Sequence, residues 1–319
     1  MLSFKEITLE DKIWIDELLQ YSDFRSAEYC FTVLYIWRGV YKTKVCRYKD
    51  FLLLRSTPSG TPQYIFPAGR GSAEELKEVL ELYMDDAGSF GVPFTLSSVP
   101  PEKKELLEQL YPGRFNYTPF RDGFDYIYLA QDLITLRGKK FQSKRNHIAR
   151  FKELPDWKYE PVTADNIKEC SLMNDEWCAR YGCGQNPSMA QEACSVKEAI
   201  ANFRELGLKG GLLRLEGKVV AFTLGEMLNS DTYIVHIEKA FAEIKGAYPA
   251  MSQEFLRHQM KYPEPLVLPN GTPNEHITPQ QIGFTYVNRE DDAGDAGLRT
   301  AKMQYNPVFL LEKWTVSEK

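Results

Sequence analysis

The chain has 319 residues, of which 43 % are hydrophobic and 26 % are charged, and its 39 lysines and arginines against 44 aspartates and glutamates give a net charge of −5. These values exclude a collagen-like, low-complexity or disordered chain. The acidic balance argues against a protein that coats nucleic acid with its whole surface. At about 100 to 200 residues per domain, the length predicts two domains.

The N-terminal residues are charged where a secretory signal would be apolar. Lys5, Glu6, Glu10 and Asp11 interrupt the first apolar run, so no export is predicted. Charged residues also break every later run before it reaches the roughly 18 apolar residues of a membrane span. We therefore expect a cytoplasmic protein with no integral membrane segment.

Four of the six cysteines lie close together, at positions 170, 178, 183 and 194. In the cytoplasm they would stay reduced. Four residues separate Cys178 from Cys183, but no histidine lies nearby to complete a zinc site. We predict no metal, and interpret these cysteines as small apolar residues of a helix and of the loop that follows it.

The first half of the chain alternates between short strands and amphipathic helices. Two segments, TLED from Thr8 and SAEE from Ser72, have the form of a capping box and predict helix starts. The predicted strands cover 4–7, 43–48, 51–55, 63–66, 93–99 and two segments within 115–129, and the predicted helices cover 8–20, 72–87 and 101–110.

The second half repeats this order of elements. The predicted strands cover 159–162, 212–215, 219–227, 232–239, 284–290 and 308–314, and the predicted helices cover 163–181, 196–206, 250–260 and 296–303. In both halves the predicted elements follow the order strand, helix, antiparallel meander, glycine-containing loop, helix, strand, helix, strand. This order resembles that of GNAT-type acyltransferases, present here twice.

The predicted fold class is therefore α/β (α+β), with two tandem GNAT-like domains, each a mixed, mostly antiparallel sheet flanked by helices. We place an N-terminal domain at residues 1–136 and a C-terminal domain at residues 153–319. Residues 137–152 contain seven lysines and arginines and no acidic residue. We interpret them as a basic linker helix that either holds donor phosphates or is simply solvated.

A proline-rich segment at 262–283 has little periodicity and predicts a long loop. Such a loop is either a lid over a site or a passive surface excursion, and the sequence leaves both open.

Two strands of the second half carry polar residues that could perform acyl transfer. Strand alternation places His236 and Glu238 on one face, and Tyr286, Asn288 and Glu290 together on the next strand. In a GNAT-type sheet these fourth and fifth strands diverge and open a cleft. A carboxylate or imidazole there could accept a proton from an attacking amine, or the residues could be surface charges at strand ends.

A donor with a pyrophosphate would bind where backbone N–H groups converge at the start of the following helix. Here that connection contains Lys245, Gly246 and Ala247, and it lacks the Q/R-x-x-G-x-G/A pattern of acetyl-coenzyme A users. The first half has Ala68-Gly69-Arg70-Gly71 at the equivalent place.

Three segments of the second half resemble a known family. They are GKKFQSKRNHIARF from Gly138, HIEKAFAEIKGAYPAMSQEF from His236 and YVNREDDAGDAGLRTAKMQYNP from Tyr286. They are similar to the C-terminal domain of bacterial phosphatidylglycerol lysyltransferases and to its stand-alone relatives. The resemblance implies two GNAT-like domains with an active cleft between them, and transfer of an aminoacyl group from charged tRNA to an amine or hydroxyl. The motif positions are Arg145, Asn146, His147, Glu238, Asn288, Arg289, Glu290, Asp292, Arg299, Lys302 and Tyr305.

We therefore predict an acyltransferase or aminoacyltransferase that moves an activated group, from acyl-coenzyme A or aminoacyl-tRNA, to a small-molecule acceptor. The alternative is a non-catalytic module of the same fold that binds coenzyme A, tRNA or another polyanion, and DNA is not an expected partner. Glu238 or His236 would be the base and Tyr305 the acid, with Glu290 as a further catalytic candidate. The predicted donor-binding residues are Lys144, Arg145, Asn146, His147, Lys245, Gly246, Ala247, Asn288, Arg289, Arg299 and Lys302.

Overall fold

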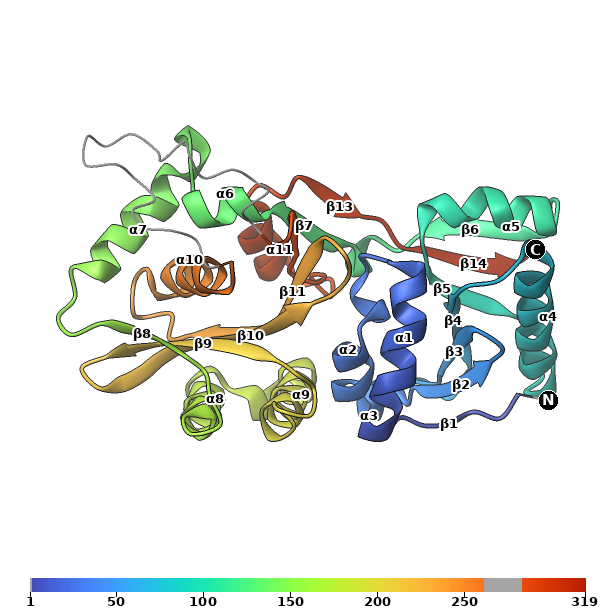
Figure 1. The fold of residues 1–319 in the computed structure, drawn as a ribbon, viewed down its shortest axis with the longest axis horizontal. Helices are drawn as coiled ribbons and strands as arrows, with labels where there is room; N and C mark the ends of the chain where they lie inside the picture. Colours follow the sequence, from blue (N-terminus) through green and yellow to red (C-terminus); the bar gives the residue numbers. More distant parts are fainter. Residues whose placement is uncertain (1, 261–282) are drawn as a thin grey trace. The chain divides into compact units, whose positions relative to one another are not determined.

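Two seven-stranded sheets organise the chain in the computed structural model, which describes residues 2–260 and 283–319 (Figure 1). The predicted loop at 262–283 lies, apart from Gly283, outside these residues. By internal contacts the first unit comprises Met1–Asp125, Asp291–Ala296 and Leu310–Lys319, and the second comprises Tyr126–Glu290 and Gly297–Phe309. The units differ from the predicted domains because the C-terminal strand joins the first unit and the basic segment 137–152 belongs to the second.

The sheet of the first unit has its fourth and fifth strands parallel and all other neighbours antiparallel. Its order is β1 (Lys5–Glu6), β2 (Lys44–Tyr48), β3 (Phe51–Ser56), β4 (Gln63–Gly69), β5 (Thr95–Val99), β14 (Trp314–Glu318) and β6 (Phe115–Pro119).

Helices lie on the two faces of this sheet (Figure 1). α1 (Lys12–Ser22) contacts β3 and β4 and buries Ile15 and Leu18. α4 (Ala73–Ser89) forms a core with the strands through Val79 and Tyr83. The smaller helices are η1 (Leu9–Asp11), η2 (Ala27–Tyr29), α2 (Phe31–Ile36), α3 (Arg38–Tyr41), η3 (Pro101–Lys103), α5 (Lys104–Leu110) and η4 (Arg121–Gly123).

The sheet of the second unit has the same plan, with its fourth and fifth strands parallel. Its order is β8 (Lys158–Pro161), β9 (Lys209–Leu215), β10 (Lys218–Met227), β11 (Thr232–Ala240), β12 (Tyr286–Asn288), β7 (Asp125–Leu129) and β13 (Phe309–Leu311).

The helices of the second unit also lie on both faces of its sheet (Figure 1). α8 (Ile167–Tyr181) contacts β10 and β11 and packs with α9 (Pro187–Ala201). α10 (Ala247–Gln259) lies on the other face, where it contacts α6 (Ala130–Thr135) and α7 (Gln142–Lys152). The remaining helices are η5 (Lys139–Phe141), η6 (Cys183–Gln185) and α11 (Ala296–Met303).

Each sheet is completed by a strand from the other half of the sequence. β14 lies between β5 and β6, and β7 lies between β12 and β13. The two strands predicted within 115–129 therefore belong to different sheets, and the strand predicted at 308–314 divides into β13 and β14. Apolar alternation identifies a strand without identifying its partner, which is why the sequence did not reveal this exchange.

Most other elements follow the prediction, and both capping boxes form. The helix predicted at 196–206 is wrong in its bounds, because α9 begins at Pro187 after the N-cap Asn186, whose side chain accepts from Ser188 N and Met189 N. The short helices α2 and α3 were not predicted. Among the described residues, no helix is both long and apolar enough to cross a bilayer.

One expectation about the cysteines is wrong. Cys178 at the end of α8 forms a disulfide with Cys183 in η6, so they do not both stay reduced. The bond is possible because the left-handed residue Gly182 turns the chain at the helix end and brings the two Cα atoms to 4.9 Å.

Candidate active site

The central feature of the second unit is the point where β11 and β12 separate. The strands pair from Thr232 opposite Tyr286 to Ile234 opposite Asn288. Beyond that pair β12 ends, whereas β11 continues to Ala240. The polar residues of both strands follow at this point. Parallel strands that part at their carboxyl ends provide a common place for ligands in α/β sheets.

His236 is the extra residue of a β-bulge in β11. Its neighbours Val235 and Ile237 lie opposite Gly225 and Leu224, which are consecutive on β10. The bulge interrupts the alternation on which the sequence placed His236 and Glu238 side by side, and the two side chains have different partners.

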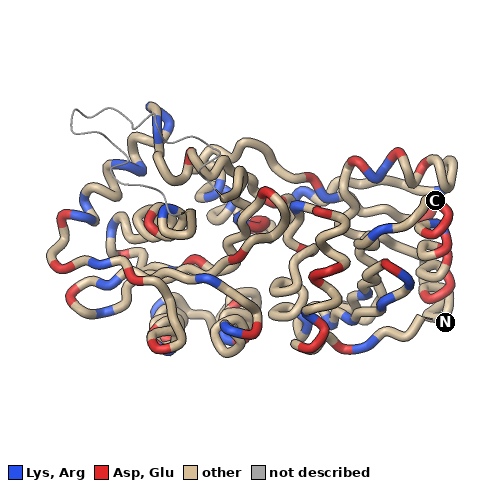
Figure 2. Tube along the Cα trace, viewed as in Figure 1, with Lys and Arg blue, Asp and Glu red and all other residues tan. Residues whose placement is uncertain are grey.

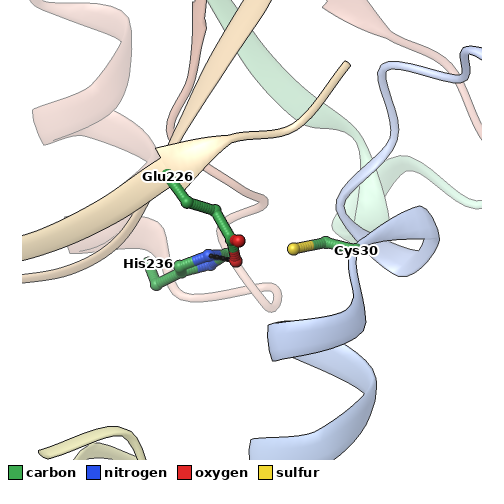
Figure 3. A group of neighbouring side chains, drawn as sticks. All are labelled: Cys30, Glu226 and His236. Carbon is green, nitrogen blue, oxygen red and sulfur yellow. Dashed lines mark hydrogen bonds and ion pairs between the residues drawn. The ribbon is translucent and has the colours of Figure 1, made fainter. Parts of the chain in front are cut away.

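The His236 imidazole, with a side chain that is 0 % exposed, lies between two carboxylates. Nδ1 is 2.9 Å from Glu290 Oε1, and Nε2 is 3.1 Å from Glu226 Oε1; Figure 3 shows the contact with Glu226. A neutral imidazole has one N–H, so two such hydrogen bonds to carboxylates require one additional proton within the group. The arrangement is therefore suited to holding and passing a proton.

Glu238 is held by the residue that follows β12. Arg289 Nη2 donates to Glu238 Oε1 at 2.9 Å, and both side chains are largely buried. Burial alone would lower the pKa of Arg289, but Glu238, Tyr128 and Tyr305 raise it, so the guanidinium stays charged. This charge-assisted bond connects the separated strands and fixes the Glu238 carboxylate.

Tyr305, just after α11, is 7 % exposed and packs against the same guanidinium, whose Cζ lies 4.6 Å from the ring centroid. Burial raises the pKa of Tyr305, and Arg289 opposes that rise only in part. The phenol is consequently protonated at neutral pH, as a proton donor must be. Behind it, Tyr128 donates to Lys302 O at 2.8 Å and Lys302 Nζ donates to Arg289 O at 2.6 Å.

α7 brings Lys144 to this cluster. Its Nζ lies 4.1 Å from the centroid of the Tyr305 ring. Burial and Arg289 lower the pKa of Lys144, whereas Glu238 opposes them. Lysines and arginines recur along α7 in Figure 2. Arg145 donates to Leu136 O and Gly138 O and so fixes the turn before the helix, while Asn146 is exposed and His147 half-buried.

A left-handed turn follows β12. Asn288, which is fully buried, accepts from Glu290 N at 2.6 Å, and Glu290 has φ 55°. Asp292 belongs to the first unit, where it accepts from Gly294 N at 3.0 Å and pairs with Arg121 at 3.2 Å. Arg299 is half-buried on α11.

The start of α10, where the sequence placed a donor pyrophosphate, is covered by α7. Gly246 has φ 90°, and a Cβ added there would lie 2.1 Å from the carbonyl oxygen of His147. Ala247 is buried and Lys245 is exposed. Gly246 therefore packs directly against the backbone of α7.

The equivalent loop of the first unit borders an open pocket of about 470 Å³. Lys49 and Arg70 line it, but Lys49 pairs with Glu78 at 2.6 Å and Arg70 with Asp50 at 3.2 Å. Glu75 also lines it and accepts from Ser72 N at 3.0 Å. These carboxylates would repel a phosphate.

Two members of the site were missed in the sequence. Glu226 could have been found by counting back across the Asn229–Asp231 turn, which places it opposite Ile234 near His236. Tyr128 gave no comparable signal, since β7 reaches this sheet from the other half of the chain.

A mixed sheet whose fourth and fifth strands are parallel, present twice in one chain, defines the tandem GNAT-like class and confirms the predicted fold. The solved structure of FemX has this fold: its TM-score is 0.60 at 11 % identity, over 98 % of this chain and 97 % of that chain. The chain belongs to the family described as "Phosphatidylglycerol lysyltransferase, C-terminal", whose model matches residues 20–317. The predicted family is thereby confirmed.

Two further structures fit this assignment. A conserved protein of unknown function from Bacteroides thetaiotaomicron is 39 % identical, with a TM-score of 0.88 and full coverage of both chains. L-PGS from Bacillus licheniformis is 14 % identical, with a TM-score of 0.64 over 99 % of this chain and 93 % of that chain. Family and fold are thus those of acyl- and aminoacyltransferases, and the individual site residues stay predictions.

Proposed function

We propose that the chain transfers an aminoacyl group from aminoacyl-tRNA to an amine or hydroxyl of a small-molecule acceptor. The observation that supports this proposal is the separation of β11 from β12, which is followed in the second unit by the Glu238–Arg289 pair and by His236 with its two carboxylates. These groups offer a base, a fixed cation and a proton relay.

The donor is inferred from two features of the same unit. Lys139 and Arg150 are exposed and belong to a segment without acidic residues that suits a polyanionic backbone. The α10 start that would hold a coenzyme A pyrophosphate is instead covered by the His147 carbonyl. Together they favour aminoacyl-tRNA over acyl-coenzyme A.

In the proposed reaction the acceptor nitrogen or oxygen attacks the ester carbonyl carbon, and its proton passes to Glu238 or to His236. The tetrahedral intermediate then collapses, the bond to the tRNA ribose oxygen breaks, and Tyr305 gives that oxygen a proton. Alignment of the two reactants accounts for most of the rate, roughly 7 to 11 kcal/mol in well-oriented systems.

The test is to incubate the protein with tRNA charged with labelled amino acids and a panel of amines and alcohols, and to detect labelled products by mass spectrometry. A parallel panel uses acyl-coenzyme A. We expect label to leave tRNA and none to leave coenzyme A. Transfer from coenzyme A would overturn the donor assignment. Salt-sensitive tRNA binding without turnover would instead identify a binding module.

A further inference from the structure

A disulfide lies at the junction of the two helices that pack together on one face of the second sheet (Figure 1). Cys178, in the last turn of α8, is bonded to Cys183 in η6, and α9 begins at Pro187. Cys178 is half-buried and Cys183 is buried, but residues 184–188, which follow the bond, are all exposed. A thiol from solution can therefore approach this junction, and the short connection can open without disturbing the core.

The last turn of α8 holds the connection between β11 and α10. Trp177 Nε1 donates to Ala240 O at 3.1 Å. The Tyr181 hydroxyl accepts from Ala242 N at 2.8 Å and donates to Glu243 Oε2 at 2.6 Å. The position of this connection therefore depends on the same helical turn that carries the disulfide.

A buried lysine depends on both helices that the disulfide joins. Lys239, the residue after Glu238 in β11, is 4 % exposed. Its Nζ lies 2.7 Å from Glu192 on α9 and 3.9 Å from the centroid of the Trp177 ring on α8. A buried ammonium is stable only while its partners stay in place. The spacing of α8 and α9 therefore acts on the residue next to the proposed base.

We propose that Cys178 and Cys183 form a reversible redox site, whose bonded state orders the end of β11 and so positions Glu238. The redox pair rests only on the geometry, whereas its effect on catalysis rests on the proposed function. When the bond is broken, the last turn of α8 frays and its contacts with residues 239–243 weaken. Glu238 then loses its fixed position beside Arg289, which binds it at 2.9 Å.

The partner of this site is a dithiol reductant. One of its thiolates attacks Cys178 Sγ, the S–S bond breaks, and Cys183 leaves as a thiolate that takes up a proton. The second thiolate of the reductant then attacks the mixed disulfide, and Cys178 leaves in the same way. Two electrons and two protons thus pass to the protein, which gains two thiols, while the dithiol becomes a disulfide.

Alkylation followed by mass spectrometry tests the redox site. The folded protein is treated with excess dithiothreitol, or with excess oxidised glutathione after reduction, in both cases without denaturant. We expect Cys178 and Cys183 to be alkylated together after dithiothreitol and to be bonded to each other again after oxidised glutathione. A bond that resists dithiothreitol in the folded protein, or that does not form again, would overturn the redox site.

Hydrogen exchange tests the link between the bond and β11. Reduction should speed exchange of the amides at 240–243 about ten- to a hundredfold, because the bond closes a short loop at the helix end, and reoxidation should restore slow exchange. Cys178→Ser should show the fast exchange without reductant. Cys194→Ser is the matched control, since it removes an exposed free thiol from α9 and should exchange like the wild type. The amides of β2 and β3 report any global unfolding and should not change.

Unchanged exchange at 240–243 after reduction would overturn the link, and so would an equal effect in Cys194→Ser. Where transfer is observed, reduction should lower its rate reversibly by about ten- to a hundredfold, the effect of displacing a catalytic group by about 1 Å. A reversible bond with faster local exchange but no transfer by either form would retain the redox site and remove only the proposed function. Transfer at one rate in both forms would instead retain the function and overturn the control of Glu238.

Discussion

The two sheets share one topology but differ in the residues at the bulge of the fourth strand. In each, the fourth strand contains a bulge and runs parallel to the fifth. In β4 the bulge contains Phe66 and Pro67, both buried and followed by buried Ala68. In β11 it is His236, followed two residues later by Glu238. The same backbone thus supports a packed core in one unit and ionisable groups in the other, so chemistry here depends on a few side chains at strand ends.

The helices that follow these strands differ in the same way. α4 begins with Glu74 and Glu75 and is rich in acidic residues, as Figure 2 shows. α10 has a single acidic residue, Glu254. α4 is therefore less suited than α10 to lie near a polyanion, and we interpret the first unit as structural support.

The largest expected effect follows from this contrast. Glu238→Gln and Tyr305→Phe should each lower the transfer rate by about 10² to 10⁴ fold, the usual contribution of a general base or acid. Glu74→Gln makes the same chemical change on the first unit and should leave the rate unchanged. Rates are measured by label transfer from charged tRNA. If Glu74→Gln proved as harmful as Glu238→Gln, the functional division between the units would be wrong.

A large effect on stability is expected at the buried cluster of the first unit. Lys313 Nζ lies 2.7 Å from Asp125 and 2.8 Å from Glu28. Lys313→Met removes the cation shared by the buried Asp125 and the partly buried Glu28, and should lower the free energy of unfolding by about 3 to 5 kcal/mol. Urea unfolding at pH 8 measures this free energy. A loss below about 1 kcal/mol would show that water solvates the two carboxylates in the variant.

The same variant should be partly rescued by acid. Burial, opposed by Lys313, raises the pKa of Asp125 to about 6 in the wild-type protein. A raised carboxyl pKa gives stability that is present at low pH and lost as pH rises through the folded-state value. Without Lys313 that pKa rises further, so the deficit of Lys313→Met should shrink between pH 8 and pH 5. A deficit independent of pH would argue that lost packing, not charge, is its cause.

Smaller effects should come from a pair of glycines, one at the end of β4 and one between β11 and α10. Gly69 (φ 129°) would place a Cβ 2.0 Å from Asp50 O, and Gly246 (φ 90°) would place one 2.1 Å from His147 O. Either glycine-to-alanine variant should lose about 1 to 3 kcal/mol in urea unfolding. Transfer should fall only for Gly246→Ala, because only that change moves α7 and Lys144. Equal loss of activity in both variants would contradict this difference.

The smallest effect is expected at the pocket of the first unit. Lys49 is exposed and paired with Glu78. Lys49→Gln should change neither the melting temperature nor the transfer rate measurably, because exposed ion pairs contribute little. A clear drop in the transfer rate would show that the first unit takes part in the reaction after all.

Local patterns in the sequence predicted local structure well. The capping boxes at Thr8 and Ser72 and the helix at 296–303 form as expected, because their signals lie within one turn. The sequence also predicted the polar residues near the strand separation. The sequence did not predict the bulge at His236, its partner Glu226 or the packing of α7 against the start of α10. Each of these depends on strand register or on packing between distant segments.

The exchange of β7 and β14 makes the halves of the chain mutually dependent. A fragment ending near residue 136 would leave β5 and β6 without the strand that joins them, and a fragment starting near residue 153 would leave β12 without its neighbour β7. Both fragments would present bare sheet edges prone to aggregation. Splitting the gene at the apparent midpoint should therefore yield two unstable products, whereas the single polypeptide supplies both exchanged strands.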